Sequence, residues 1–138
     1  MRNANGSGEA PIWMGSNRQG LALIRRSWYG QEDNLSAGVQ EKEITNYCRT
    51  RGIELVKSEN IIESAKDSDF RKKFHAAVEW ALKNKIRHLL YYMTDREVRN
   101  FTDLEKMEKL ILSDRIVVHY VRDNRQLHKW SPPSDFSH

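Results

Sequence analysis

One short stretch decides the fold: LALI at residues 21–24, which runs directly into Arg25, Arg26 and Ser27. A short run of apolar residues is typical of a strand that is buried on both faces, as in a parallel sheet. Further runs of this kind recur along the chain. We therefore expect strands near residues 21–26, 53–57, 88–93 and 116–121, with a short edge strand near 126–130.

Helical patterns separate these strands. The first predicted helix has Ser36 as its N-cap and ends near Gly52. Its inward face is predicted to comprise Leu35, Val39, Ile44 and Cys48. The second helix has the clearest periodicity and begins at Ser68 or Asp69. Its inward face is predicted to comprise Phe70, Phe74, Ala77, Val78, Ala81 and Leu82.

A third helix is predicted from a capping box formed by Thr102 and Glu105. Its inward residues are Leu104, Met107 and Ile111. Strands that alternate with helices predict an α/β fold, with a mainly parallel sheet of four to five strands and helices on both faces.

The segments outside this pattern are polar. Residues 1–18 lack periodicity, and we expect them to form a flexible leader before a single domain at 19–138. The stretch from Lys57 to Ser68 is also polar and aperiodic, which predicts an extended loop. No apolar run is long enough to cross a membrane, so no membrane partner is expected.

Composition narrows the function classes. The net charge is +4 with a pI of about 9.3, which is compatible with a nucleic-acid partner. Cys48 is the single cysteine, which favours a reducing, cytoplasmic setting. No histidines or cysteines have metal-ligand spacing, so no metal and no cofactor are expected.

Parallel sheets carry their chemistry beyond the carboxyl ends of the strands. The first strand ends in Arg25-Arg26-Ser27, with Gln31 four residues after the serine. Guanidinium groups beside a hydroxyl suit phosphoryl chemistry, because arginine is always charged and can hold two phosphate oxygens. Taken alone, the triplet is better explained as a charged strand end that begins a loop.

Two further clusters follow the same rule. Asp95, Arg96 and Arg99 come directly after the third strand, and the two arginines share a face if the turn is helical. Arg71, Lys72 and Lys73 stand near the start of the second helix, where cations oppose the helix dipole. Charge in this unfavourable position hints at an anionic partner. An exposed turn and a solvated helix end are the structural alternatives.

Other phosphate and acyl chemistries are disfavoured by spacing. The chain has no glycine-rich phosphate loop ending in Lys-Ser or Lys-Thr, and no GxGxxG motif. Ser27 lies between Arg26 and Trp28, so it is not in a Gly-x-Ser-x-Gly elbow. Cys48 has Glu54 rather than arginine six residues later, which argues against a cysteine phosphatase. His88 and His119 lie in predicted strands and are expected to be packed core or surface residues rather than metal ligands.

Together these segments resemble the catalytic domain of the serine recombinases, the resolvase and invertase family, from about Gly20 to Phe136. The family's opening Arg-x-Ser with a later glutamine matches Arg25, Ser27 and Gln31, and its Leu-Ser-x-x-x-Gln motif matches residues 35–40. The long interval from Ser27 to Gln40 is more similar to the large serine recombinases than to the small resolvases.

Three later motifs complete the resemblance. The family's Glu-Asp-x-x-x-Ser-Gly loop aligns with residues 59–65, its Arg-Pro-x-Phe motif with 71–74, and its Leu-Asp-Arg-Leu-x-Arg signature with 94–99. The chain departs from the family pattern at several positions. These are Leu23, Arg26, Trp28, Asn60, Ala65 and Lys72.

The resemblance implies a resolvase-like fold and a mechanism. Ser27 would attack a DNA phosphodiester and form a 5′-phosphoserine link, and strand exchange and religation would follow. The implied catalytic residues are Ser27, Arg25, Arg71, Asp95, Arg96 and Arg99. The implied supporting residues are Gln31, Gln40 and Ser64.

The resemblance also implies partners: DNA, and further copies of the chain as a dimer and tetramer in the full-length protein. His138 aligns with the point where the family's long dimer helix begins, so we expect that helix and the DNA-binding domain to be missing and self-association to be weak. Two alternatives remain open at this stage. One is a module on the same fold that has lost catalysis, and the other is a flavodoxin-like domain for a small molecule or protein partner.

Overall fold

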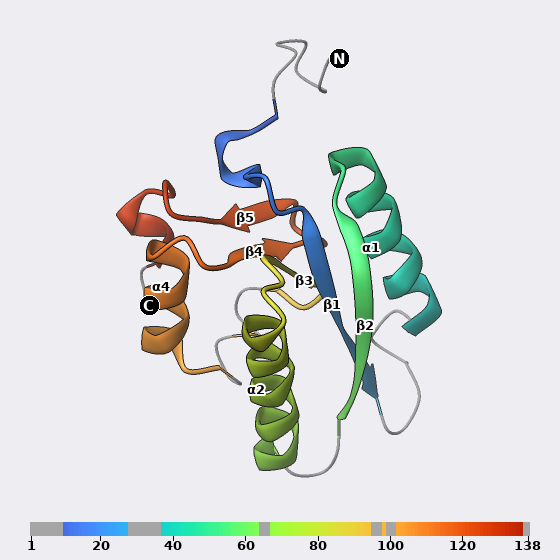
Figure 1. The fold of residues 1–138 in the computed structure, drawn as a ribbon. Helices are drawn as coiled ribbons and strands as arrows, with labels where there is room; N and C mark the ends of the chain where they lie inside the picture. The colour runs from blue at the N-terminus through green and yellow to red at the C-terminus, as the bar shows by residue number, and fades with distance from the viewer. Residues whose placement is uncertain (1–9, 28–36, 64–66, 95–97, 99–101, 137–138) are drawn as a thin grey trace.

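A computed structural model describes residues 10–27, 37–63, 67–94, 98 and 102–136 (Figure 1). Strands and helices alternate along most of it. In chain order the elements are η1 Ile12–Met14, β1 Gln19–Ser27, α1 Ala37–Arg51, β2 Glu54–Glu63, α2 Asp67–Lys83, β3 His88–Tyr91, α4 Leu104–Leu112, β4 Val117–Tyr120, β5 Arg125–Leu127 and η2 Pro133–Phe136.

The strands form a five-stranded sheet in the order β2-β1-β3-β4-β5. β1 pairs in parallel with β2 and β3, and β3 pairs in parallel with β4. β5 returns antiparallel to β4 and forms an edge. The sequence-based prediction of an α/β fold with a mainly parallel sheet is confirmed.

Alternate residues of β1 contact different helices. Leu21 and Leu23 pack into one apolar cluster with Phe74 of α2 and Met107 of α4. The intervening Ala22 and Ile24 pack into a second cluster. Its other members include Ile44 and Cys48 of α1. Figure 1 shows α1 on one side of the sheet and α2 and α4 on the other, so helices cover both faces.

One predicted loop is wrong. The chain from Lys57 onward was expected to leave the sheet, but β2 continues to Glu63. Its backbone pairs with β1 from Gln19 opposite Glu54 to Ser27 opposite Glu63, with one register shift between Gly20 and Leu21. β2 is an edge strand, so polar side chains such as Glu59 can reach solvent while Ile61 is buried. Polar composition therefore did not rule out a strand here.

Details of the helices also differ from the predictions. Val39 was expected to face the core, but it is 41% exposed, whereas Ile44 is fully buried. The cap of α4 is Asp103, whose side chain accepts a hydrogen bond from the Lys106 N–H at 3.1 Å, and not Thr102. The predicted capping box was thus placed one residue too early.

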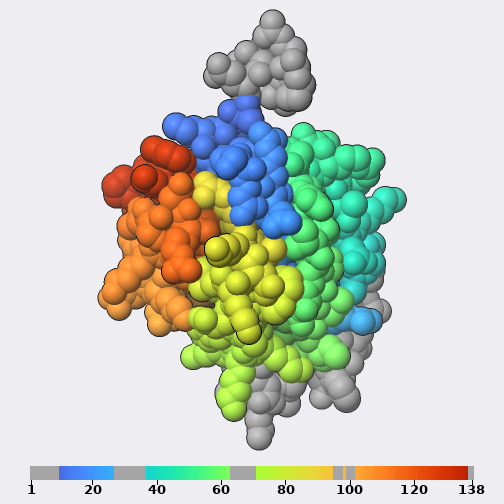
Figure 2. All heavy atoms as spheres, viewed as in Figure 1, coloured from blue at the N-terminus to red at the C-terminus, as the bar shows by residue number. Residues whose placement is uncertain are grey.

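Residues 10–18 are part of the domain, where the sequence favoured a leader. Met14 is only 1% exposed, and the amide of Asn17 donates a hydrogen bond to the Lys85 carbonyl. Gly15 has a φ of 70°, and a side chain there would meet Arg87, so the tight turn requires glycine. Figure 2 shows this segment in blue between the C-terminal residues and the green β2–α1 region. We call residues 10–18 the N-terminal strap.

The contrast within α1 gives a stability test. Ile44→Ala should lower the free energy of unfolding by about 2–5 kcal/mol, because it leaves a cavity in the core. Val39→Ala should change it by less than about 0.5 kcal/mol, because the side chain is on the exposed side of α1. Urea denaturation measures both. Equal losses in the two variants would contradict the observed orientation of α1.

Candidate active site

The predicted site residues that the structure describes lie around the carboxyl ends of β1 and β2. The two strands run in parallel and end together, with Arg25 opposite Ile61 and Ser27 opposite Glu63. α2 begins at Asp67, shortly after β2. Figure 1 shows the first turns of α2 at this same end of the sheet. We call it the carboxyl edge.

Arg25 lies on the face of the sheet that α2 covers. Alternation along β1 places position 25 with Leu21 and Leu23, whose side chains pack against α2. Arg25 is half-buried, whereas Arg26 is exposed and falls on the other face. Ser27 is the last residue of β1, and its side chain lies outside the described part of the structure.

Arg71 approaches the same face from α2. It lies three residues before Phe74, so the two side chains are neighbours on the surface of the helix. Phe74 is fully buried against the sheet. Arg71, Lys72 and Lys73 are all exposed. They stand in the second turn of α2, which begins at Asp67, and they bring positive charge to this edge.

Gln40 holds the end of β1 from the opposite face. Its side-chain oxygen accepts a hydrogen bond from the Arg25 N–H at 3.3 Å, and its side-chain nitrogen donates to the Arg25 carbonyl at 2.8 Å. β3 stops at Tyr91, which is opposite Leu23, so the β3 ladder does not reach Arg25. The buried amide of Gln40 thus takes the place of a neighbouring strand.

Five predicted residues lie outside the described part of the chain. They are Gln31, Ser64, Asp95, Arg96 and Arg99. Two described residues nonetheless bracket the Asp95–Arg96 segment. The Val98 N–H donates to the Thr94 carbonyl at 3.0 Å, and Val98 is buried in the cluster that contains Phe74. The chain at residue 98 is therefore anchored on the α2 face, the face that also carries Arg25.

A groove beside this edge was not predicted. It has a volume of about 370 Å³ between β2 and α2. It is lined by Lys57, Glu59, Asn60, Ile61, Lys73, Ala76, Ala77 and Trp80. The Lys57 Nζ lies 4.4 Å from the centre of the Trp80 ring and 3.6 Å from a Glu59 carboxylate oxygen. The signal was present in the helical spacing of Lys73, Ala77 and Trp80, but the loop prediction for β2 hid it.

Within the described ranges, no group of three or more His, Cys, Asp or Glu side chains is placed to hold a metal ion. Among the same residues, no helix combines the length and apolar character that crossing a bilayer requires.

Comparison with known families decides the identity. The family described as "Resolvase, N terminal domain" matches residues 21–135. The chain belongs to this family. It is thus a serine recombinase catalytic domain, a site-specific recombinase domain, as its strand-end motifs indicated.

One solved structure supports the fold assignment of this resolvase-family domain. The N-terminal catalytic domain of TP901-1 integrase is similar, with a TM-score of 0.52 and 14% sequence identity. The similarity covers 78% of this chain and 80% of that domain. A search of curated proteins gives no significant match. The flavodoxin-like alternative is set aside, because the family match spans nearly the whole domain.

The Gln40 contact makes a testable prediction. Gln40→Glu keeps an acceptor for the Arg25 N–H but places a carboxylate oxygen against the Arg25 carbonyl. We expect a loss of about 1–3 kcal/mol in unfolding free energy at pH 7, because a buried acceptor loses its donor. Amide exchange at Arg25 should become faster.

The stability loss in Gln40→Glu should also depend on pH in a defined direction. Protonating the introduced carboxylate restores a donor, so the pKa of that group rises on folding and the deficit relative to wild type should shrink as the pH falls. Glu41→Gln, an exposed change on the same helix, should have little effect at either pH. An unchanged Arg25 exchange rate in Gln40→Glu would contradict the role of Gln40.

Proposed function

We propose that the carboxyl edge cleaves and rejoins DNA strands, with Ser27 as the nucleophile. The observation that carries the proposal is the approach of Arg25 and Arg71 to one face of the sheet, at the strand end where Ser27 stands. The family match supports the reaction class.

The proposed chemistry exchanges one ester for another. The Ser27 oxygen attacks the phosphorus of a DNA phosphodiester, the bond from phosphorus to the 3′-oxygen breaks, and the 3′-oxygen leaves as a hydroxyl with a proton. The 5′-phosphate remains on the serine. Rejoining runs the same steps backward with a 3′-hydroxyl from another strand. Neither direction consumes an oxidant or a nucleotide.

Arginines supply the stabilisation that this reaction needs. Attack builds negative charge on the nonbridging oxygens, and fixed cations at that position lower the barrier. We assign this role to Arg25 and Arg71, together with Arg96 and Arg99. Asp95 would orient an arginine or pass the proton to the leaving oxygen.

The supporting residues act on position. Gln40 holds the backbone of Arg25 and so fixes the direction in which β1 leaves the sheet. Gln31 and Ser64 would position the loops on either side of Ser27. The partners of the full-length protein would be DNA and further copies of the chain, with four subunits cleaving before strands exchange.

The subfamily is part of the proposal. The long interval between Ser27 and Gln40 and the fold shared with TP901-1 integrase favour a large serine recombinase. Lys73 and Lys57 extend positive charge from the carboxyl edge into the groove beside α2, where a DNA backbone would find cations.

A second candidate rests on departures from the family pattern. Asn60 stands in the groove wall where the family pattern has an acidic residue. This change, with Arg26 and Trp28 beside the serine, favours a DNA-binding module on the same fold that no longer cleaves. Covalent trapping on DNA distinguishes the two candidates.

Trapping also tests the assigned roles. On a nicked suicide substrate that carries the recombination site, the wild-type full-length protein should give a protein–DNA band on a denaturing gel. Ser27→Ala should abolish the band while DNA binding persists, because only the hydroxyl is lost. Arg71→Ala should slow cleavage by about 100- to 1,000-fold.

Lys72→Ala is the matched control for Arg71, because it removes the adjacent exposed cation. We expect it to weaken cleavage by less than about tenfold. A band that persists in Ser27→Ala would show that another residue attacks the DNA. Equal losses of cleavage rate in Arg71→Ala and Lys72→Ala would show that Arg71 contributes only general positive charge.

Removal of divalent metal gives an independent check on the arginine mechanism. Since the arginines are assigned the charge stabilisation, EDTA should change neither cleavage nor rejoining by more than about twofold. The rate of band formation measures this. Dependence of the chemical step on added magnesium would favour a metal-dependent nuclease.

A further inference from the structure

A buried chain of hydrogen bonds crosses the amino-terminal edge of the sheet, opposite the carboxyl edge. Its central members are His88 of β3 and His119 of β4, both fully buried. The His88 Nδ1 lies 2.9 Å from the His119 Nε2, and the His119 Nδ1 lies 2.8 Å from the Tyr47 hydroxyl. Gln126 donates to that hydroxyl at 2.9 Å.

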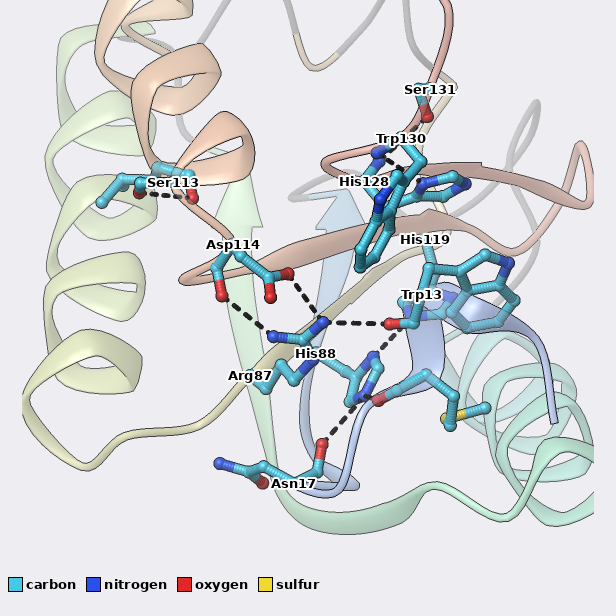
Figure 3. Close-up of polar contacts among 12 residues, drawn as sticks. Trp13, Asn17, Arg87, His88, Ser113, Asp114, His119, His128, Trp130 and Ser131 are labelled. Atoms are coloured by element: carbon cyan, nitrogen blue, oxygen red, sulfur yellow. Dashed lines mark hydrogen bonds and ion pairs between the residues drawn. The ribbon is translucent and has the colours of Figure 1, made fainter.

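The far end of the chain meets the N-terminal strap. The His88 Nε2 lies 3.2 Å from the Met14 carbonyl and 3.1 Å from the Asn17 carbonyl (Figure 3). The chain therefore joins β5, α1, β4 and β3 to residues 10–18. We call it the histidine relay.

The contacts determine the direction of every bond in the relay. Two carbonyls face the His88 Nε2, so this nitrogen carries a proton and donates. In a neutral ring the His88 Nδ1 must then accept, which makes the His119 Nε2 the donor. The His119 Nδ1 accepts in turn from the Tyr47 hydroxyl, whose oxygen accepts from Gln126. In this arrangement both rings are neutral and every link has one donor and one acceptor.

An added proton breaks this order. A proton on the His88 Nδ1 would point at the N–H of His119 and force that ring into its other tautomer. The His119 Nδ1–H would then point at Tyr47, whose own hydroxyl proton would have to turn away. One protonation thus disturbs the relay from the strap to β5.

The surrounding charges also disfavour a cation. Four basic side chains act on the two rings: Arg18 and Arg87 on His88, and Arg51 and His128 on His119. The nearby acids are engaged elsewhere, since Asp114 pairs with Arg87 at 2.8 Å and Asp135 lies 3.9 Å from Arg125. Burial, together with the Arg87 charge, lowers the pKa of His88 to about 4. Burial, with the neighbouring His88, lowers the pKa of His119 well below its ordinary value.

The strap depends on this edge for its attachment. Besides the His88 contacts, Arg87 donates to the Trp13 carbonyl at 3.1 Å, and Trp13 stacks on His128 and packs edge-on against His119. The strands, by contrast, are held by continuous ladders. Opening the strap therefore exposes the relay to water without breaking the sheet.

We infer that the histidine relay is a pH-sensitive latch, in which protonation of the His88–His119 pair releases residues 10–18 from the amino-terminal edge. The closed latch requires neutral rings, and the open state lets water solvate a charged ring. The inference concerns the edge opposite the proposed active site and does not depend on the proposed function.

The direction and size of the pH dependence of latch opening follow from proton linkage. A pKa lowered on closing means that the open state binds more protons, so the latch is most stable above pH 6.5 and weakens as the pH falls towards 4. For His88 alone, the opening equilibrium should rise about 30-fold between pH 7.5 and pH 5. Titration of His119 adds to this.

Amide hydrogen exchange tests the latch directly. After correction for intrinsic rates, protection of the Met14 amide should fall about 30-fold or more between pH 7.5 and pH 5, while the Leu23 amide in β1 stays protected. Unchanged protection at Met14 would overturn the inference. A parallel loss at Leu23 would also overturn it, because the domain would then be unfolding as a unit.

Two histidine variants test which residue causes the pH response at Met14. His88→Gln removes the titrating ring, so the pH response at Met14 should shrink at least tenfold. His75→Gln changes a half-buried histidine on α2 that is outside the relay and should leave the response intact. If His75→Gln abolished the response, or His88→Gln kept it, the relay would not be the sensor.

Ring nitrogen shifts in the wild-type protein give a second measurement that needs no variant. Nitrogen-15 NMR should show His88 and His119 as neutral rings protonated at Nε2 at pH 7.5. A charged ring, or protonation at Nδ1, in either residue at that pH would contradict the bond directions and sink the proposal even if His88→Gln failed to fold.

Discussion

The hydrogen bonding of β1 is the constraint on which the rest of the structure depends. β1 has strands on both sides and helices on both faces, so its backbone groups must be satisfied inside the protein. β3 supplies partners only as far as Leu23, and the Gln40 amide replaces it at Arg25. A buried strand can thereby extend past its neighbour and carry Ser27 to the carboxyl edge. The cost of burying a polar glutamine is offset because both ends of its amide are bonded.

The two edges of the sheet differ in charge: one exposes cations and the other buries neutral histidine rings. At the carboxyl edge, Arg71, Lys72 and Lys73 are exposed near the start of α2, so positive charge faces solvent. At the amino-terminal edge, His88 and His119 are sealed as neutral rings beneath the strap, with arginines nearby that resist protonation. The parallel sheet separates these environments, because its crossover helices return the chain to the same edge before the next parallel strand begins.

Sequence reasoning found the fold because each signal was local. The apolar run at 21–24 and the periodicity around Phe74 are properties of neighbouring residues, and both elements are present. The failures involve long-range contacts. The predicted second strand ended at residue 57 because Lys57 and Glu59 are polar, although an edge strand tolerates polar residues. The strap was missed because Met14 is buried by residues distant in sequence, including His88, which lies 74 positions away. Val39 fits the helical period, yet it is largely exposed at that end of α1.

At the candidate site, too, local motifs were predicted and features that depend on long-range contacts were not. Arg25, Arg71 and Gln40 were identified from motifs, and their placement at one edge follows from the parallel order of the strands. The partner of Gln40 could not be predicted, because it depends on β3 ending at Tyr91 rather than at residue 93. The groove beside α2 was hidden by the mistaken loop. The relay was hidden because His88 and His119 are far apart in sequence and become neighbours only through strand pairing.

The central claim is that the carboxyl edge of β1 is where DNA becomes bonded to the protein. Mass spectrometry of the trapped complex, after nuclease and protease digestion, locates the linked residue without any substitution. The account predicts a phosphate or short nucleotide remnant on Ser27, in the peptide that ends β1. A remnant on any other residue would contradict the account.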